Sequence, residues 1–373
     1  MNPWNFNRNL EDKIEIVFND LVVEPGFCNL SCKYCLSNQM PTWLLEDQPN
    51  SITKKLIYSE ETELKHQLDS MFKNYNNIFD ASILRISGGE IFLVKGIIDF
   101  LKAHHENFDV VQIVTNGLLL NEENIKKLKE ITNCHLHISL DGHTTGLNNN
   151  RVKSHYQQET ILKNLENSVK AGFPIEIGAV LSNTNTRNFT EFLDYLLKYN
   201  NQIIVFPFPL RGEAKERFHP DRESILEFSK VIENYSKYQN ILLPFSYIEE
   251  VYKILKEDKR QLRCHIPKTM LQFFNDGNIS PCPNGWASSL GNLIKDDSSE
   301  IKSKIGRDKI YSLFLQSRPR LSFCKECFTS LDIINLYIEG KISEEELASI
   351  PLYSGPRTQA RLKYIKNKTY ESL

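Results

Sequence analysis

Three cysteines stand close together near the start of the chain, at Cys28, Cys32 and Cys35. A 4Fe–4S cluster normally takes four cysteine thiolates as ligands. Three nearby thiolates would leave one iron with an open position, and an open position on a metal is where substrate or cofactor binds. The same cysteines also fit half of a zinc site, since zinc sites use paired C-x₂₋₄-C spacings that close to four ligands. The cysteines alone leave both alternatives open.

A second motif, Gly88-Gly89-Glu90, follows a strand expected over residues 82–87. Glycines let the backbone approach a ligand closely, and a carboxylate accepts hydrogen bonds from an ammonium group. A strand-to-helix turn with a capping acid is the simpler explanation of Gly-Gly-Glu on its own. Taken together, Cys-x₃-Cys-x₂-Cys with Tyr34 before the third cysteine, followed by Gly-Gly-Glu, resembles the radical S-adenosylmethionine (SAM) superfamily. Ile91 stands where that family usually has proline.

The resemblance implies a set of cofactor contacts. Cys28, Cys32 and Cys35 would hold the cluster, SAM would chelate the fourth iron, and Gly88, Gly89 and Glu90 would bind its amino group. Further expected SAM contacts, each of which also has an ordinary capping or turn explanation, are Tyr34 at the adenine, Ser139 and Asp141 after the fourth strand, Arg151 at the carboxylate, Ser182 at the ribose and, more weakly, Asn116.

Four more cysteines lie in the C-terminal part, at Cys264, Cys282, Cys324 and Cys327. Four thiols in this arrangement fit zinc or an iron–sulfur cluster. Their order, with Gly-x₄-Cys and Gly-Asn between them, resembles the auxiliary-cluster module of SPASM/twitch radical SAM enzymes. No cysteine follows Cys327, which resembles the shortened twitch form with one auxiliary 4Fe–4S cluster. Full cysteine ligation would leave no open iron, so we expect an electron-transfer or structural role there.

The catalytic acid or base is not evident. His265, which follows an expected ligand and is expected near the barrel mouth, and His143, on a barrel-top loop, are weak candidates because imidazole titrates near neutrality. Pro283 follows Cys282 where sulfatase-maturating relatives carry an aspartate base, so alcohol oxidation through that base is in doubt. Other residues that flank the C-terminal cysteines, and are guesses at substrate contacts, are Lys268, Asn284 and Trp286.

Composition sets limits on these interpretations. The chain has 373 residues, is 40% hydrophobic and 25% charged, and carries a formal net charge of −2, so no global electrostatic case exists for nucleic acid or an anionic membrane. We find no apolar run long enough to span a bilayer and no secretion signal, and we expect a cytoplasmic protein. In that compartment seven of its eight cysteines are expected to be metal ligands rather than disulfides, and Cys134 is expected to be a small buried apolar residue.

The elements that must position these residues alternate as in a parallel α/β protein. Strands are expected over 19–25, 82–87, 110–114, 135–140, 175–181 and 203–206, with helices over 53–74, 94–105, 122–130, 160–171 and 189–199. The six units resemble the partial (β/α)₆ TIM-like barrel of radical SAM proteins, with the ligands past the carboxyl ends of its strands. The expected regions are a lead-in over 1–18 with helical character over 11–16, the barrel over 19–210, a helical bridge over 211–262, a small α+β iron–sulfur (twitch-like) domain over 263–332 with a hairpin at Asp276-Gly277, and a helical tail over 333–373.

The resemblance implies reductive cleavage of SAM to a 5′-deoxyadenosyl radical that abstracts hydrogen from a substrate. Such an enzyme needs an electron donor, such as flavodoxin or ferredoxin. We expect oxidation or cross-linking of a peptide, although residues 1–27 are too short for the leader-recognition domain of many peptide maturases. A small-molecule dehydrogenase or epimerase, acting for example on an aminosugar, is the alternative, and a zinc-stabilised binding protein without turnover is the remote one.

Overall fold

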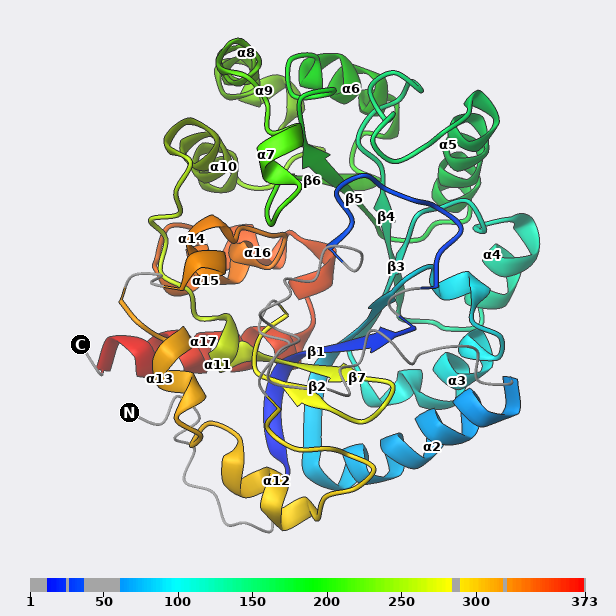
Figure 1. Ribbon diagram of the computed structural model, residues 1–373, viewed down its shortest axis with the longest axis vertical. Coiled ribbons are helices and arrows are strands. Elements are labelled where there is room, and N and C mark those ends of the chain that lie inside the picture. The colour runs from blue at the N-terminus through cyan, green and yellow to red at the C-terminus, as the bar shows by residue number, and fades with distance from the viewer. Residues whose placement is uncertain (1–11, 25–26, 37–60, 284–288, 318–320, 372–373) are drawn as a thin grey trace.

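The structure, a computed structural model, describes residues 12–24, 27–36, 61–283, 289–317 and 321–371. Six parallel strands form a curved sheet in the order β6-β5-β4-β3-β2-β1, which confirms the predicted α/β alternation (Figure 1). The strands are β1 (Ile14–Val23), β2 (Phe79–Gly88), β3 (Val110–Thr115), β4 (Cys134–Ser139), β5 (Ile175–Leu181) and β6 (Ile203–Pro209).

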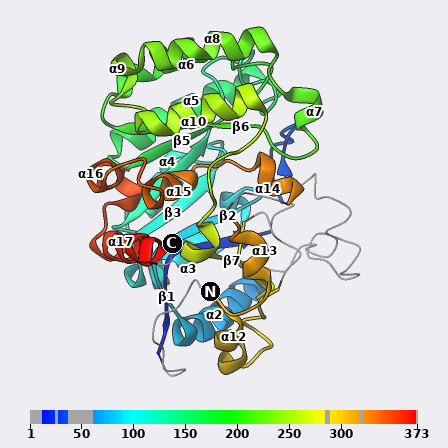
Figure 2. The same ribbon diagram turned by 90° about the vertical axis from the view of Figure 1, so that its left-hand side faces the viewer.

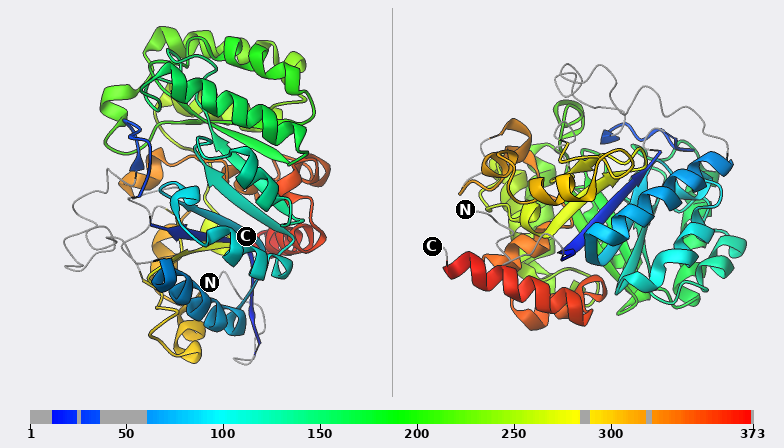
Figure 3. Two further views of the ribbon diagram at one scale, coloured as in Figure 1. Left: turned by 90° about the vertical axis from the view of Figure 1, so that its right-hand side faces the viewer. Right: turned by 90° about the horizontal axis from the view of Figure 1, so that it is seen from below.

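Helices on the outer face connect these strands, as parallel strands require (Figure 3). They are α2 (Glu61–Ile78), α3 (Ile97–His104), α4 (Glu122–Leu128), α5 (His155–Lys170) and α6 (Phe189–Leu196), with short 3-10 helices η2 (Ile91–Leu93), η3 (His105–Asn107) and η4 (Leu197–Tyr199). Buried isoleucine, valine, leucine and phenylalanine side chains of strands and helices make one continuous core.

Two local predictions were wrong. The helical character expected over 11–16 is contradicted because β1 already begins at Ile14, where the run Ile-Glu-Ile-Val-Phe is rich in residues that favour strands. The helix expected from residue 160 begins at His155 instead. Ser154 caps it, with the side chain accepting a hydrogen bond from the Gln157 amide, so the polar loop is shorter than expected.

On the other side of β1 the sheet continues with residues from the C-terminal part of the chain. β7 (Met270–Phe274) pairs parallel with β1, and β8 (Ile279–Ser280) pairs antiparallel with β7, which gives an eight-stranded sheet. Figure 3 shows β7 beside β1 when the molecule is seen from below. The predicted hairpin is present, with Gly277 at a φ of +89°. The expected twitch-like segment is therefore joined to the barrel by the sheet itself.

The segment expected as a helical bridge also continues the barrel. Leu242 forms a parallel bridge with Val205 of β6, and the Val205 amide donates to the Ile241 carbonyl at 2.7 Å. This isolated bridge extends the sheet past β6 at Leu242, within residues 241–245, for which the sequence predicts an extended segment. The helices around it are α7 (Lys215–Phe218), α8 (Arg222–Glu233), α9 (Tyr235–Tyr238) and α10 (Phe245–Glu257), and α10 packs on β6.

The helical tail closes the side of the barrel between β6 and β1. Figure 2 shows α17, then α15 and α16, then α10 stacked from below upward on this side, and α15 contacts both α10 and α17. The remaining elements are α11 (Ile266–Thr269), α12 (Ser298–Lys304), α13 (Ile310–Phe314), α14 (Ser322–Glu326), α15 (Asp332–Ile338), α16 (Glu344–Ala348), η5 (Pro351–Tyr353) and α17 (Pro356–Glu371). Of the helices that the structure describes, none has the length and apolar character needed to cross a membrane.

Candidate active site

The three-cysteine loop leaves the carboxyl end of β1 and packs against the end of β2. A Cβ on Gly88 would lie 1.8 Å from the Val23 carbonyl oxygen, and one on Gly89 would lie 1.9 Å from that of Phe27. The Glu90 amide donates to the same Phe27 carbonyl at 2.8 Å. Both glycines are thus required for the cysteine loop to sit on β2. The sequence predicted a close approach to a ligand here, and the structure shows a close approach to the loop that carries the cysteines.

Glu90 lies buried between the ends of β2 and β3. Its carboxylate accepts hydrogen bonds from the Thr115 hydroxyl at 2.7 Å and the Asn116 amide at 2.8 Å. Burial raises the pKa of Glu90 in spite of these donors. The Asn116 side chain in turn donates to Asn29 at 2.7 Å and lies 3.7 Å from the Cys28 sulfur. Asn116, a weak candidate from the sequence, therefore links the Gly-Gly-Glu segment to the cysteine loop.

A buried ion pair holds the loop from the side of β4. Arg151 Nη2 donates to Asp141 Oδ1 at 3.1 Å, and the Tyr34 hydroxyl donates to Asp141 Oδ2. The Arg151 guanidinium lies over the Tyr34 ring at 5.6 Å, and its Nη1 lies 3.9 Å from the Cys32 sulfur. Burial opposes the charge on Arg151, but the carboxylate of Asp141 outweighs it and raises the pKa of the guanidinium. Arg151 therefore stays positive beside a cysteine sulfur.

The donors around the cysteine sulfurs fit an anionic thiolate cluster. The Leu30 amide lies 3.4 Å from the Cys28 sulfur, and Arg151 and Asn116 supply the contacts already given. Across the described residues, no three His, Cys, Asp or Glu side chains stand gathered as around a bound metal ion. Burial, only partly offset by Arg151, raises the pKa of Cys32 to about 11, so cluster assembly must remove its proton and draw the thiolates together.

The two serines expected to contact SAM lie at strand ends on the same edge. Ser182 follows β5 and is buried, and its hydroxyl accepts from Asn150 Nδ2 at 3.2 Å. The Asn150 carbonyl accepts from the Lys33 amide at 2.8 Å, which connects this serine to the cysteine loop. Ser139 ends β4, half-buried. The structure thus brings the predicted cluster and SAM residues together at the carboxyl ends of the strands. Their contacts with SAM remain predictions.

Below this edge the barrel holds a polar group that the sequence analysis missed. Asp20 of β1 accepts from Nε and Nη2 of Arg85 on β2, both at 2.9 Å, from Ser87 at 3.0 Å and from Gln272 of β7 at 2.9 Å. Strands of a parallel sheet covered on both faces are usually almost continuously apolar. The charged residues Asp20 and Arg85 within the apolar runs of β1 and β2 could therefore have indicated this polar group from the sequence.

A second polar group adjoins the first along the sheet, since Gln112 of β3 is the register partner of Arg85. Gln112 of β3 donates to Glu176 of β5 at 2.6 Å, past β4, and His137 Nδ1 lies 3.3 Å from the same carboxylate oxygen. Side chains can reach past an intervening strand only on the concave face, so these groups line the barrel interior. Oε1 of Glu176 and Oε1 of Gln272 are buried without a hydrogen-bond partner among the described residues. We call the residues of these two groups the barrel floor.

The segments of Cys264 and Cys327 meet at a buried arginine. Arg260 pairs with Asp332 at 2.6 Å, both side chains being 2% exposed. Its guanidinium also donates to the Cys327 carbonyl at 2.6 Å and the Leu262 carbonyl at 2.7 Å, so it fastens the two cysteine segments together. Burial raises the pKa of Cys264 to about 11, and negative charge on Asp332 and Cys327 adds to that increase, as expected if the Cys264 and Cys327 thiols lie near one another.

Cys324 lies near the Cys264 and Cys327 thiols, whereas Cys282 follows β8. Burial raises the pKa of Cys324 to about 12, and the charges of Cys327 and Cys264 add to that increase. Arg211 places Nη1 3.7 Å from the Cys327 sulfur. Cys282 lies just past β8, buried, and its carbonyl accepts from Ser280 at 2.9 Å.

The two candidate histidines, His265 and His143, are held by contacts with neighbouring side chains. His265 precedes β7 and so lies toward the amino ends of the strands, which contradicts its expected place at the barrel mouth. It is fully buried and pairs with Glu339. His143 stacks on Tyr195 of α6 at 4.8 Å. Lys268 faces α17, where it donates to Thr369 at 3.1 Å. Asn284 and Trp286 lie outside the described residues.

Comparison with known proteins agrees with this geometry. Residues 25–196 match the Radical SAM superfamily. The uncharacterized protein MJ0907 of Methanocaldococcus jannaschii is 27% identical over 74% of this chain and 87% of its own length. The GTP 3',8-cyclase of Helicobacter pylori strain J99 is 26% identical over 68% of this chain and 77% of its own.

Solved structures show the same fold. AdoMet-bound anSMEcpe aligns over 94% of this chain and 100% of its own, at 16% identity and a TM-score of 0.53. SuiB of Streptococcus suis, bound to its precursor peptide SuiA, aligns over 79% of this chain at 15% identity and a TM-score of 0.53, and this chain spans 65% of SuiB. At such identities the likeness concerns the fold alone. Together with the sequence match, these findings show a radical SAM domain over residues 25–196 of the chain.

Proposed function

We propose that this chain binds a 4Fe–4S cluster through Cys28, Cys32 and Cys35 and cleaves SAM reductively there. When bound, the cluster and SAM supply a 5′-deoxyadenosyl radical, which abstracts hydrogen from an unactivated C–H bond. The observation that carries this proposal is the anchoring of the three-cysteine loop, by Asn116 on one side and Arg151 on the other, at the carboxyl ends of the strands. Active sites of barrel enzymes are built at that edge.

The protein's own part is to orient the cofactor and to exclude water. Glu90 Oε2 accepts one hydrogen bond, from the Asn116 amide, and a carboxylate oxygen can accept a second from an ammonium group. A bound ammonium would also favour the ionised form that burial disfavours. Tyr34, Ser139, Asp141 and Ser182 complete the proposed SAM site.

We also propose an auxiliary 4Fe–4S cluster at Cys264, Cys282, Cys324 and Cys327. The support is the pair of arginines, Arg260 and Arg211, beside these sulfurs, because positive charge stabilises thiolates. A zinc ion at the same cysteines is the alternative, and metal analysis distinguishes the two.

The proposed substrate is a peptide, which the enzyme oxidises or cross-links. The support is the fold shared with SuiB, solved with its precursor peptide, and with anSMEcpe, solved with the Kp18Cys peptide. A small molecule is the second candidate, because several curated relatives are named GTP 3',8-cyclase. The charged barrel floor fits a polar substrate group in either case.

The proposal also includes an electron donor and a cellular compartment. A flavodoxin or ferredoxin would supply the electron. The cytoplasm would keep the cysteines reduced, and all eight are free in the structure.

Anaerobic reconstitution tests the chemistry. We expect the wild-type protein, reduced with dithionite, to convert SAM to 5′-deoxyadenosine and methionine, measured by liquid chromatography and mass spectrometry. The triple variant C28A/C32A/C35A should lose this activity and its share of the bound iron. The matched control is Cys134→Ala, which removes a buried thiol outside both cysteine sites. A colourless zinc protein, or a triple variant that still cleaves SAM, would refute the proposal.

Deuterium transfer distinguishes the substrates. A deuterated peptide encoded beside this gene should pass deuterium into 5′-deoxyadenosine if the protein is a peptide maturase. Transfer from deuterated GTP or an aminosugar, with none from the peptide, would establish the small-molecule alternative.

A further inference from the structure

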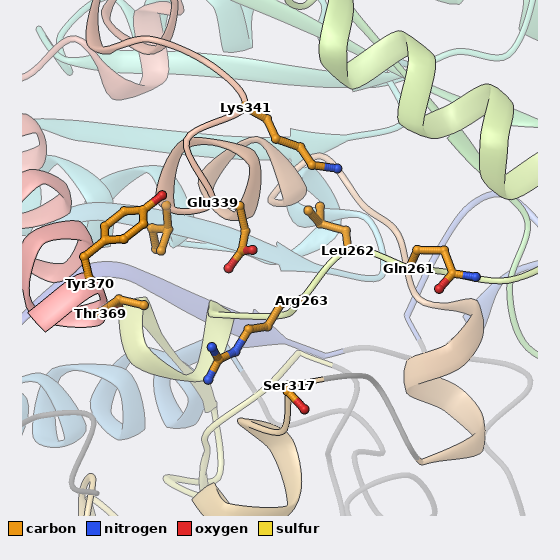
Figure 4. A pocket seen from close by; sticks show the side chains of 9 residues that line it. Gln261, Leu262, Arg263, Ser317, Glu339, Lys341, Thr369 and Tyr370 are labelled. Carbon is orange, nitrogen blue, oxygen red and sulfur yellow. The ribbon is translucent and has the colours of Figure 1, made fainter. Parts of the chain in front are cut away.

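A pocket of about 410 Å³ lies where the segment before α11 meets the ends of α15 and α17. It is separate from the cysteine loop, since α11 leads into the beginning of β7 and the cysteine loop follows the end of β1. Arg263, Glu339 and Lys341 line it, and Thr369 and Tyr370 form the wall on the α17 side (Figure 4). The volume is in the range of small-molecule sites.

Arg263 has no partner in this pocket. Over the part of the chain that the structure describes, its guanidinium donates no hydrogen bond and forms no ion pair, and its Nε is buried without an acceptor. Only its main-chain carbonyl is used, by Arg260. Figure 4 shows the Arg263 guanidinium and the Glu339 carboxylate on opposite sides of the opening. A buried, unsatisfied donor costs free energy that a ligand with acceptor atoms would recover.

The charges around the pocket are unbalanced toward positive. Lys268, behind Thr369, donates among the described residues to the neutral Thr369 hydroxyl, and burial together with the charge of Arg263 lowers the pKa of Lys268 to about 8. Glu339 is the one carboxylate among the lining residues, and it already accepts from His265. Lys341 pairs with Glu250 outside the pocket, at 3.2 Å. An anion would therefore enter a pocket with excess positive charge.

We propose that this pocket binds a small molecule through a carboxylate or phosphate group held by Arg263. A guanidinium offers paired donors that match both groups in a bidentate arrangement. Lys341 and Tyr370 line the same pocket, and Lys268 adds positive charge from behind Thr369. The proposal does not depend on SAM cleavage, since it concerns binding at a different place.

Calorimetric titration of the reconstituted protein tests this proposal, with inorganic phosphate in one arm and succinate in the other. We expect saturable binding at one site, and the tighter probe identifies the head group. Arg263→Gln should weaken binding at least ~10-fold, as expected for loss of hydrogen bonds to a charged group. Arg222→Gln is the matched control, since Arg222 is exposed on the distant α8, and it should bind as wild type does.

Because Arg263 is adjacent to Cys264, a second variant is needed to separate loss of anion binding from damage to the cysteine site. Glu339→Gln removes the carboxylate that an anion must approach, so it should bind the preferred probe more tightly than wild type. Iron content of each variant shows whether the cysteine site is intact. The proposal is overturned if neither probe binds wild type at millimolar concentration, or if Arg263→Gln binds as wild type does.

Discussion

At the scale of single residues, the cysteine site is defined as much by its neighbours as by its thiols. Arg151 places positive charge beside Cys32 while Asp141 keeps that charge in position. Asn116 and the Leu30 amide give the Cys28 sulfur two neutral donors. Charge and hydrogen bonds at sulfur are the protein's means of setting the potential of an iron–sulfur cluster.

Removing the charge of Arg151 should therefore change that potential. We expect Arg151→Met to lower the midpoint potential of the N-terminal cluster, because the reduced, more negative cluster loses the cation beside Cys32. An electron paramagnetic resonance titration measures this. Arg151→Lys keeps the charge and should stay closer to wild type, so equal shifts in both variants would contradict the electrostatic explanation.

Lys268 should make the proposed pocket sensitive to pH. Its pKa of about 8 lies below the usual value because the amine is partly buried near Arg263, so the positive charge is present below pH 8 and lost above it. The other charged groups facing the pocket are Arg263, Glu339 and Lys341, with His265 behind Glu339.

Anion affinity should accordingly fall several-fold as the pH rises through about 8. Titrations at several pH values measure the change. Lys268→Met should bind more weakly at pH 7 and show a flatter profile. A wild-type profile that Lys268→Met reproduces unchanged would assign the titration to another group.

At the scale of elements, Arg260 joins segments that are far apart in sequence. It ties the residues before α11 to the turn after α14, and Asp332 at the start of α15 neutralises it. A buried ion pair adds little net stability, but removing one partner leaves an uncompensated charge in the interior.

Breaking the Arg260–Asp332 ion pair should lower the stability of the protein. Arg260→Gln should lower the free energy of unfolding by about 3–5 kcal/mol, measured by urea denaturation, and reduce the metal bound at the C-terminal cysteines. The double variant R260M/D332L removes both charges and should recover much of the stability. If it is less stable than Arg260→Gln, hydrogen bonding rather than charge explains the role of Arg260.

At the scale of the whole molecule, the C-terminal helix completes the barrel. Arg361 of α17 donates to the Ile16 carbonyl of β1 at 2.9 Å, and to the Ser82 hydroxyl at 2.9 Å and the Asp80 carboxylate at 2.7 Å on β2. The tail therefore holds the amino ends of the two strands whose carboxyl ends carry the cysteine loop and Glu90.

Arg361→Gln should destabilise the whole fold by about 1.5–3 kcal/mol, the range for hydrogen bonds to charged groups, and thermal unfolding measures it. Arg357→Gln is a matched control on the same helix, since Arg357 also pairs with Asp80, at 3.0 Å, but is 38% exposed against 12% for Arg361. Solvent screening should make its loss smaller. Equal losses would show that the exposed pairs matter as much as the buried one.

The sequence by itself determined the resemblance to radical SAM proteins and the six-strand alternation, and it predicted the two sets of cysteine ligands. These depend on local spacing and on patterns within single strands, so they can be read without knowing what lies opposite. The start of α5 needed only one more local signal, the cap at Ser154. His265 was misplaced because the side of the barrel it occupies depends on the direction in which β7 pairs.

Only the tertiary structure decided the rest. The parallel pairing of β7 with β1, the barrel floor of Asp20, Arg85 and Glu176, and the clamp of Arg260 each join residues separated by tens to hundreds of positions. The pocket at Arg263 is of the same kind, because its walls come from the segment before α11 and from the ends of α15 and α17. Contacts of this kind are set by which faces meet when the core closes, and no local pattern records that.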